Sequence, residues 1–315
     1  MEKLLEFRNI CKYFPGVKAL EQVSFDLYPG EVHVIVGENG AGKSTLMKVL
    51  SGAYTADSGQ IFFEGKEIIK NSPKISEELG ISMIYQELNL IPELSVASNV
   101  FLGHELKKGI FVNKKEQKKQ ANELLKAAGI SVDAGALVKN LGVGTQQMVE
   151  IAKALSKNAK VLVFDEPTSS LTESEIRELF QMIKKLKKQG VGMFYISHRL
   201  EELFEIGDRV TVMRDGRHIL TDSIKNMTMS QIIENIAGRA IENLYPHEPK
   251  EKGDVLFEIK NLNGEKFHDI SIKVHSGEIV GISGLVGAGR TETVRAAFGI
   301  DSYTSGEVYI GGKLP

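Results

Sequence analysis

A glycine-rich segment, Gly37–Ser44, constrains the fold of this chain more than any other feature of its sequence. The segment reads GENGAGKS and fits the pattern G-x-x-x-x-G-K-[ST]. The apolar run VHVIV precedes it at Val32, and TLMKVL follows with a helical pattern at Thr45. A tight turn between a buried strand and a helix points backbone N–H groups inward, where they can surround a phosphate. The segment therefore predicts an α/β domain with a phosphate-binding loop.

We expect this loop to hold the phosphates of a nucleotide, with Lys43 on the outer phosphates and the Ser44 hydroxyl on Mg²⁺. The chain carries 39 basic and 41 acidic residues, a net charge of −2. This balance argues against binding of nucleic acid or anionic lipid through bulk charge alone, so any phosphate must be held locally. The expected nucleotide contacts are Gly37, Glu38, Asn39, Gly40, Ala41, Gly42, Lys43, Ser44 and Thr45.

Apolar runs that read as buried strands alternate with helical patterns over the first 240 residues, as in an α/β domain. Two such runs are VLVF at Val161 and MFYI at Met193, and Asp215-Gly216 is typical of a tight hairpin turn. The stretch 95–156 is mostly helical in pattern and predicts a helical insertion. A helix is also expected from Glu175 to Gly190. Its apolar face consists of Ile176, Leu179, Phe180, Ile183 and Leu186.

The run VLVFDE delivers two carboxylates, Asp165 and Glu166, at the end of a predicted strand. Ligands bind at the carboxyl ends of strands in open α/β sheets, so these groups belong beside the phosphate loop. Asp165 would hold Mg²⁺ through water, and Glu166 would accept a proton from the attacking water. A strand that ends in Asp-Glu can also simply begin a solvated loop. The phosphate loop at Gly37 in the same domain favours the functional interpretation.

An internal repeat organises the whole chain. GEVHVIVGENGAGKST at Gly30 matches GEIVGISGLVGAGRTE at Gly277, and DSGQI at Asp57 matches TSGEV at Thr304 with the same offset of 247 residues. LEFRNI at Leu5 matches FEIKNL at Phe257, but at an offset of 252, so the second copy is shorter around YFPGV. We predict a first domain over 1–239, a polar linker over 240–254 and the incomplete start of a second copy over 255–315.

The single cysteine, Cys11, excludes an internal disulfide and a cysteine-rich zinc site. No stretch approaches 18 consecutive apolar residues, and the amino end is charged where a signal peptide would be apolar. We therefore expect a cytoplasmic protein that neither crosses a membrane nor is exported.

The order of motifs in the first copy resembles that of ABC-type ATPases. LGVGTQQMVEIAKAL at Leu141 and VLVFDEPTSSLT at Val161 resemble the signature segment and the hydrolysis motif of that family, and Ser197-His198 follows on the next strand. The resemblance implies a mixed sheet core with a helical subdomain. It also implies ATP and Mg²⁺ as ligands.

The resemblance assigns roles to three further residues. Gln86 would sense Mg²⁺, His198 would contact the γ-phosphate, and Phe14 would stack on adenine. Taken singly, each has an ordinary interpretation, as a surface glutamine, a helix-capping histidine and a core aromatic residue. The implied signature residues are Leu141, Gly142, Val143, Gly144, Thr145 and Gln146.

Two motifs depart from the family pattern. Gly142 stands where the signature L-S-G-G-Q has serine, which removes a charge-assisted hydrogen bond of about 1.5–3 kcal/mol to a γ-phosphate. Arg290 stands in the second loop, Gly284–Thr291, where lysine belongs. Because the family binds nucleotide between the loop of one unit and the signature of the other, both departures fall on one composite site. We expect one competent and one degenerate site.

The chain resembles the tandem ATPase subunits of bacterial monosaccharide ABC importers of the ribose, galactose and xylose type. The resemblance lies in the duplicated unit and in the segments QQMVEIAKAL, DEPTSSLT and GAGRTE. This resemblance implies the amino-terminal part of an ATPase subunit on the inner face of the cell membrane. Its partners would be a second ATPase half or copy, a permease docking on residues 87–103 and, through that permease, an extracellular sugar-binding protein.

Two other functions of ABC proteins fit this sequence less well than transport. Soluble tandem ABC proteins that act on ribosomes keep both sites intact and carry a long basic linker, unlike this chain. ABC proteins of DNA repair carry cysteine-rich zinc modules, against which the single cysteine argues.

A basic cluster is spaced as a solvated helix face that includes Glu116. Its lysines are Lys107, Lys108, Lys114, Lys115, Lys118 and Lys119.

Overall fold

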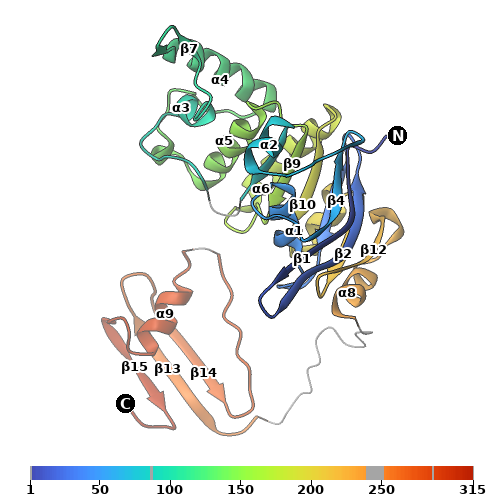
Figure 1. Cartoon of the computed structure of the whole chain (residues 1–315). Helices are drawn as coiled ribbons and strands as arrows, with labels where there is room; N and C mark the ends of the chain where they lie inside the picture. Colours follow the sequence, from blue (N-terminus) through green and yellow to red (C-terminus); the bar gives the residue numbers. More distant parts are fainter. Residues whose placement is uncertain (1, 86–87, 239–251, 286, 315) are drawn as a thin grey trace. The chain divides into compact units, whose positions relative to one another are not determined.

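The chain divides into two compact units, 1–241 and 242–315. A computed structural model describes residues 2–85, 88–238, 252–285 and 287–314, and Figure 1 shows its elements. Among the described residues, no helix has the length and apolar content that spanning a bilayer requires.

A six-stranded sheet forms the centre of the first unit, in the order β12-β11-β3-β10-β9-β6. The strands are β3 (Val32–Val36), β6 (Ile81–Ile84), β9 (Val161–Asp165), β10 (Gly192–Ile196), β11 (Arg209–Arg214) and β12 (Arg217–Ser223). All neighbours are parallel except β11 and β12, which form an antiparallel edge. The predicted mixed sheet is therefore confirmed, and the predicted strands at Val32, Val161 and Met193 are its buried middle.

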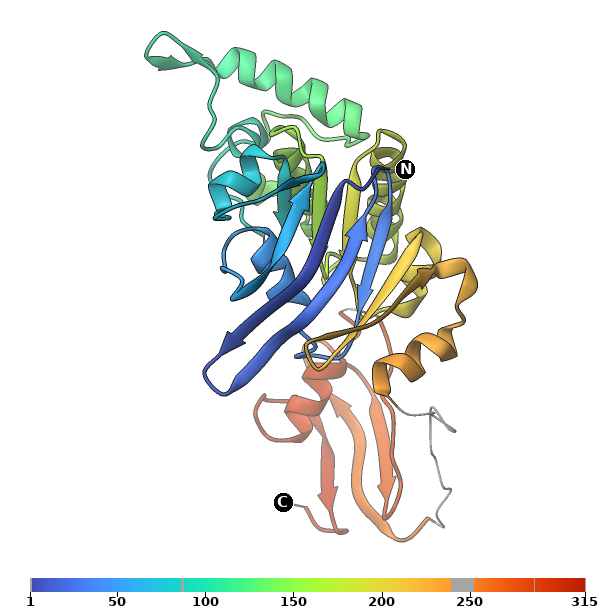
Figure 2. The ribbon, with the colours of Figure 1, turned by 45° about the vertical axis from the view of Figure 1, so that its right-hand side comes forward.

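A second, antiparallel sheet in the order β2-β1-β4-β5 covers one face of the first. Its strands are β1 (Leu5–Phe14), β2 (Val17–Leu27), β4 (Ser58–Phe63) and β5 (Lys66–Glu67). Figure 2 shows β1 and β2 as a long twisted hairpin. Helix α1 (Lys43–Leu50) contributes four buried residues to the shared core, and Phe7, Phe25 and Phe194 join the two sheets with ring centroids 5.1–5.9 Å apart. The helix that follows the phosphate loop is thus anchored between the two sheets.

Helices cover the opposite face of the six-stranded sheet. They are α5 (Val143–Leu155), α6 (Glu173–Lys188), α7 (Leu200–Ile206) and α8 (Met229–Ala237), with a 3-10 turn at Ile224–Asn226. The predicted apolar face of α6 is confirmed, since all five of its residues are buried in this core. Thr172 and Glu175 form a capping box at its start, and Gly190 lies just beyond its end with a φ of 87°.

The predicted helical insertion is confirmed as a small subdomain with its own core. It comprises α3 (Val96–Val100), α4 (Lys114–Ala128), a 3-10 turn at Val138–Asn140 and α5, while α2 (Pro73–Glu78) precedes β6. It also contains a feature that the helical pattern did not predict, a hairpin of β7 (Lys107–Lys108) and β8 (Phe111–Val112). The predicted turn at Asp215-Gly216 joins β11 to β12 with φ values of 51° and 74°, as a type I′ hairpin requires.

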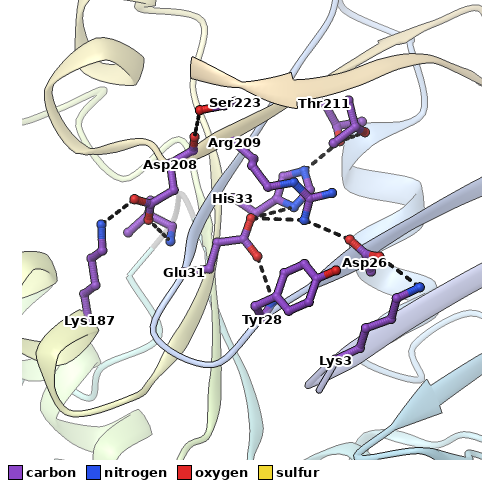
Figure 3. Close-up of polar contacts among 12 residues, drawn as sticks. Lys3, Asp26, Tyr28, Glu31, His33, Lys187, Asp208, Arg209, Thr211 and Ser223 are labelled. Carbon is purple, nitrogen blue, oxygen red and sulfur yellow. Dashed lines mark hydrogen bonds and ion pairs between the residues drawn. The ribbon is translucent and has the colours of Figure 1, made fainter. Parts of the chain in front are cut away.

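A network of charged side chains lies at the amino ends of the central strands, at the edge of the sheet opposite the phosphate loop (Figure 3). Arg209 approaches Asp26 at 2.8 Å and Glu31 at 3.3 Å. His33 is fully buried, with Nε2 2.6 Å from the Thr211 hydroxyl and Nδ1 3.5 Å from Glu31. Burial lowers the pKa of His33 to about 3, so its ring is neutral at physiological pH.

The second unit repeats the start of the first. Its sheet, in the order β14-β13-β15, consists of β13 (Val255–Asn263), β14 (Ile270–His275) and β15 (Ser305–Ile310), and the helix is α9 (Arg290–Ala297). This order matches β2-β1-β4 of the first unit, with the same antiparallel pairings. Within 252–285 and 287–314 the unit has no counterpart of β10 or β11, and Ile279, which matches the enclosed Val32, is 90% exposed.

Candidate functional site

The phosphate loop leaves the carboxyl end of β3, whose five residues are all buried between β10 and β11. Two glycines are required by the packing around this exit. A Cβ on Gly37 would overlap the carbonyl oxygen of Met213, and one on Gly42, where φ is 95°, would lie 2.5 Å from the carbonyl oxygen of Ala19. The loop is therefore fixed by its neighbours, while Glu38, Asn39 and Gly40 remain exposed.

Lys43 folds back across the loop that precedes it. Its Nζ donates hydrogen bonds to the carbonyl oxygens of Gly37 at 2.8 Å and Glu38 at 3.0 Å. Burial lowers the pKa of this ammonium group, while the charges of Glu166 and Asp165 oppose the shift. An ammonium group has donors only, so phosphate oxygens can replace these carbonyls and make charge-assisted bonds.

Ser44 and Asp165 bring a hydroxyl and a carboxylate together beside the loop. Asp165 ends β9, and its carboxylate is hydrogen-bonded by Ser44 at the start of α1. Burial raises the pKa of Asp165, and the Ser44 hydrogen bond acts in the opposite direction. No group of three or more metal-ligating side chains occurs in the part of the chain that the structure describes. Two oxygens fit Mg²⁺ whose other ligands are phosphates and water.

Glu166 and His198 form a pair beyond the phosphate loop. The two side chains approach to 3.4 Å, between Oε2 and Nδ1, from the ends of adjacent parallel strands β9 and β10. Glu166 has a φ of 49°, a left-handed conformation that is strained for a residue other than glycine, and its N–H donates to Ile196 O at 3.0 Å. The strained backbone directs a largely shielded carboxylate toward an exposed imidazole.

Phe14 lies at the tip of the β1–β2 hairpin and is partly exposed. Its ring packs edge to face on Tyr54 with centroids 5.4 Å apart, and the Lys12 ammonium lies 5.5 Å from its centroid. Asp57 accepts hydrogen bonds from Tyr13 N at 2.5 Å and Lys12 Nζ at 3.1 Å. One carboxylate thus ties the hairpin tip to the segment after α1, leaving part of the Phe14 ring accessible for stacking.

The signature segment, Leu141–Gln146, forms the start of α5. Gly142 is its N-cap and, having no side chain, supplies no capping hydrogen bond. The N–H of Gly144 instead donates to Glu175 Oε1 at 3.1 Å, and a Cβ at Gly144 would overlap that carboxylate. Gln146 donates to the carbonyl of Leu141 at 2.9 Å, while Val143 is exposed. The start of α5 is therefore tied to the start of α6.

A cavity of about 800 Å³ opens beside Ser44 and Asp165. Lys48 from α1 and Tyr85, which follows β6, also line it, and Glu150 and Lys153 enter from α5. The cavity thus extends from the predicted metal ligands to the helical subdomain. Gln86, predicted to sense the metal and to act in catalysis, lies outside the described residues.

Comparison with known proteins agrees with this geometry. Residues 20–169 match the family model described as "ABC transporter". The chain is also similar to a solved structure of MJ1267, an ATP-binding cassette of an ABC transporter, with 30% identity and a TM-score of 0.67. The similarity covers 75% of this chain and 99% of that one. The chain belongs to the ATP-binding cassettes of ABC transporters.

Curated relatives of this cassette are more similar still. A protein of Rubrobacter xylanophilus named "Ribose import ATP-binding protein RbsA 1" is 50% identical over 314 residues. One of Lacticaseibacillus paracasei named "Ribose import ATP-binding protein RbsA" is 48% identical over 312 residues. The matches cover 99% and 98% of this chain, but the chain spans only 63% and 62% of the relatives' lengths.

Two residues that hold this cassette's site were not predicted from the sequence. Glu202 on α7 is 4% exposed and accepts hydrogen bonds from Tyr195 and Ser197 hydroxyls, both at 2.8 Å. It thereby fixes the strand end that carries His198. Glu175 accepts from Gly144 as well as from Thr172 N at 2.8 Å. A glutamate at the third position of a helix was the available signal for Glu175, whereas Glu202 resembles any surface glutamate in sequence.

The described glycines of the cassette's second loop have backbone angles similar to those of the first loop. Gly284, Gly287 and Gly289 have φ values of 159°, 84° and 76°, and α9 begins at a left-handed Gly289 as α1 begins at Gly42. The Arg290 side chain folds back toward the loop, since a Cβ on Gly284 would lie 3.5 Å from its Cδ. The cradle is repeated with a bulkier, forked cation in the place of lysine.

Proposed function

We propose that this chain binds Mg-ATP and is part of the motor of a sugar importer. The observation that carries the proposal is the convergence of Lys43, Ser44 and Asp165 on one loop, with Glu166 and His198 at the adjacent strand end. The names of the relatives support sugar import, and they favour transport over the alternative function on ribosomes.

The named residues divide the work of phosphoryl transfer to water. Backbone N–H groups of Gly37–Ser44 and the Lys43 ammonium hold the outer phosphates, and Phe14 stacks on the base. Mg²⁺ held by Ser44 and Asp165, with Gln86 as a further ligand, would neutralise phosphate charge and orient the terminal phosphate. Glu166 accepts the proton of the attacking water, and His198 contacts the γ-phosphate.

The signature residues Leu141–Gln146 would act on nucleotide bound by another unit, so a complete site needs two units. ATP binding closes the units, and hydrolysis lets them reopen. A membrane permease, docked on residues 87–103 beside the 800 Å³ cavity, would follow this motion. Through the permease, an extracellular sugar-binding protein would supply the substrate. In this arrangement the chain works at the cytoplasmic face of the membrane.

Glu166→Gln tests the proposed general base in the chain extended through a complete second unit. We expect ATP affinity to be retained and turnover to fall by about 100-fold or more, because general-base catalysis contributes that much. Binding is measured by calorimetry and turnover by phosphate release. The matched control is Glu178→Gln, at an exposed position of α6, which should leave both unchanged. Unchanged turnover in Glu166→Gln would remove Glu166 as the base.

Lys43→Ala tests the loop itself. Loss of the ammonium group should abolish measurable ATP binding by this chain, since the outer phosphates lose their charge-assisted hydrogen bonds to it. The control Lys66→Ala, on the exposed strand β5, should bind ATP as the parent does. If the parent chain binds no ATP, the proposed function fails.

A further inference from the structure

A surface at the outer end of the helical subdomain is not used by the proposed function. It combines three exposed apolar residues, Ile110–Val112, with six exposed lysines. The lysines are Lys107, Lys108, Lys114, Lys115, Lys118 and Lys119. We call this surface the hairpin patch. Ile110 is 89% exposed and Phe111 73%, and apolar side chains so exposed and so close together mark an interaction site.

The chain builds the patch as one ordered piece. Lys107 pairs with Val112 and Lys108 with Phe111, and Gly109 takes a φ of 64° at the turn between the two strands. Asn113 N donates to Leu106 O at 2.7 Å, closing the hairpin. The side chain of Asn113 then caps α4 by accepting from Glu116 N at 3.2 Å. The apolar tip and the lysines of α4 are therefore held together by a single residue.

The patch is strongly basic although the chain is not. Residues 105–119 contain six lysines and two glutamates, a net charge of +4, so the rest of the chain carries −6 to give the total of −2. Among the described residues, Lys118 alone of the six forms an ion pair, with Asp133 at 3.2 Å. The net charge of the whole chain does not attract an anionic surface, whereas the local charge of residues 105–119 attracts one.

An anionic lipid surface is the occupant that this combination fits best. Figures 1 and 2 both show the hairpin projecting beyond the end of α4, and the apolar side chains Ile110 and Phe111 at its turn are exposed. A membrane interface accepts a projecting apolar tip without a complementary pocket, whereas a protein partner would need a recess for it. Lysines beside such a tip contact lipid phosphates, and each adds to the binding.

We propose that the hairpin patch rests on a membrane that contains anionic lipid, with Ile110 and Phe111 in the interfacial region and the lysines on lipid phosphates. This contact is separate from nucleotide binding. It would hold the helical subdomain at the membrane surface next to residues 87–103, which are assigned to the permease under the proposed function. The lipid contact itself needs neither nucleotide nor permease.

Co-sedimentation of the whole chain with lipid vesicles tests the proposal without nucleotide. One set of vesicles is phosphatidylcholine alone, and the other is phosphatidylcholine with an equal amount of phosphatidylglycerol. We expect binding to the anionic set to exceed binding to the neutral set by at least about tenfold and to weaken as salt is added. Equal binding to both sets, or none to either, would overturn the proposal.

Two variants separate the apolar and basic contributions. Ile110→Ser with Phe111→Ser removes the tip, and Lys107→Gln with Lys108→Gln removes two charges. Each should weaken binding to anionic vesicles by about tenfold, with an unchanged circular dichroism spectrum. The matched control is Ile69→Ser with Lys66→Gln and Lys70→Gln, an exposed isoleucine and two exposed lysines elsewhere on the unit, which should bind as the parent does.

The outcome distinguishes lipid from a protein partner. If both patch variants bind anionic vesicles as tightly as the parent, the hairpin patch is not the lipid contact. If the chain binds vesicles only when they carry the permease, and the patch variants lose that binding, the patch contacts protein and the lipid proposal is wrong. Either result leaves the ATP-binding proposal intact, because no nucleotide is present.

Discussion

Phe14 shows how a single side chain depends on neighbours that are distant in sequence. The order of motifs predicted a role for its ring, but the packing that orients it comes from Tyr54, which has no family signal of its own. Asp57 holds the same hairpin tip through Tyr13 and Lys12. Sequence identifies a residue that touches a ligand more readily than the residues that position that side chain. Positioning requires only a suitable shape or one hydrogen bond, and many residue types can supply either.

Phe14→Ala should weaken ATP binding by about 5- to 150-fold, the equivalent of about 1–3 kcal/mol of stacking, and leave the affinity for inorganic tripolyphosphate unchanged. Tyr54→Ala should cause a smaller loss of the same kind, and Tyr54→Phe should restore binding because it keeps the ring. Titration calorimetry with both ligands provides the measurement.

The double variant decides whether Tyr54 acts through Phe14. Adding Tyr54→Ala to Phe14→Ala should cause no further loss, since the ring that Tyr54 orients is already absent. Tyr303→Ala, at an exposed tyrosine of the second unit, serves as the control. Additive losses would show that Tyr54 does not act by positioning Phe14.

At the scale of elements, sequence patterns predicted the long or fully apolar segments and missed one short hairpin. Strands β3, β9 and β10 and helix α6 have unbroken apolar runs or clear faces, so their burial was predictable. The two-residue strands β7 and β8 are too short to show a period. Their lysines instead extend the helical pattern of α4, which is why the whole segment resembled one solvated helix.

The packing of three neighbouring strands around His33 has a consequence for stability. The ring, carried by β3, is buried against Phe25 of β2, Phe194 of β10 and Thr211 of β11, and its pKa falls from 6.5 to about 3 on folding. The unfolded chain therefore binds an extra proton between these values, so the free energy of unfolding decreases as the pH is lowered through that range. Between about pH 8 and pH 5 the His33 contribution to this loss is about 2 kcal/mol.

His33→Gln removes this titration and keeps a polar group toward Thr211. Urea unfolding at a series of pH values should show a flatter acid limb for this variant, whereas His268→Gln, at an exposed histidine, should keep the parent slope. Burial raises the pKa of Glu31, which acts in the opposite direction, but parent and variant share that effect. An equal acid slope in parent and His33→Gln would contradict the assignment.

At the scale of the whole molecule, the repeat read from the sequence corresponds to a repeat of topology. The sheet of the second unit has the strand order and pairings of β2-β1-β4 in the first unit, a correspondence that the internal repeat predicted. The five missing residues fall where the first unit has Phe14, so the second unit, as described, has no equivalent hairpin tip. The domain boundaries around residues 239 and 255 remain a prediction.

Turnover should depend on a second, complete unit. We expect this chain alone to bind Mg-ATP but to hydrolyse it slowly, and a version extended through the complete second unit to turn over at least about tenfold faster at equal concentration. The reason is that a site built from one phosphate loop needs a signature segment from another unit. Phosphate release over a series of protein concentrations provides the measurement.

The concentration series also identifies self-pairing. If the rate per molecule of the unextended chain rises with concentration, two copies pair and the signature at Leu141 is competent despite Gly142. Brisk turnover by a dilute, verified monomer would contradict the two-unit site.

The two loops of this molecule allow one motif to be compared with its copy in the same chain. Gly37 and Gly284 differ by one degree in φ, and Gly40 and Gly287 also differ by one degree, while the cations at the matched positions 43 and 290 differ in kind. The two loops therefore differ in their cation, whereas their matched glycines keep similar left-handed or extended backbone angles. Exchanging the two cations, Lys43→Arg in one loop and Arg290→Lys in the other, would therefore separate the effect of the cation from that of the surrounding loop within a single chain.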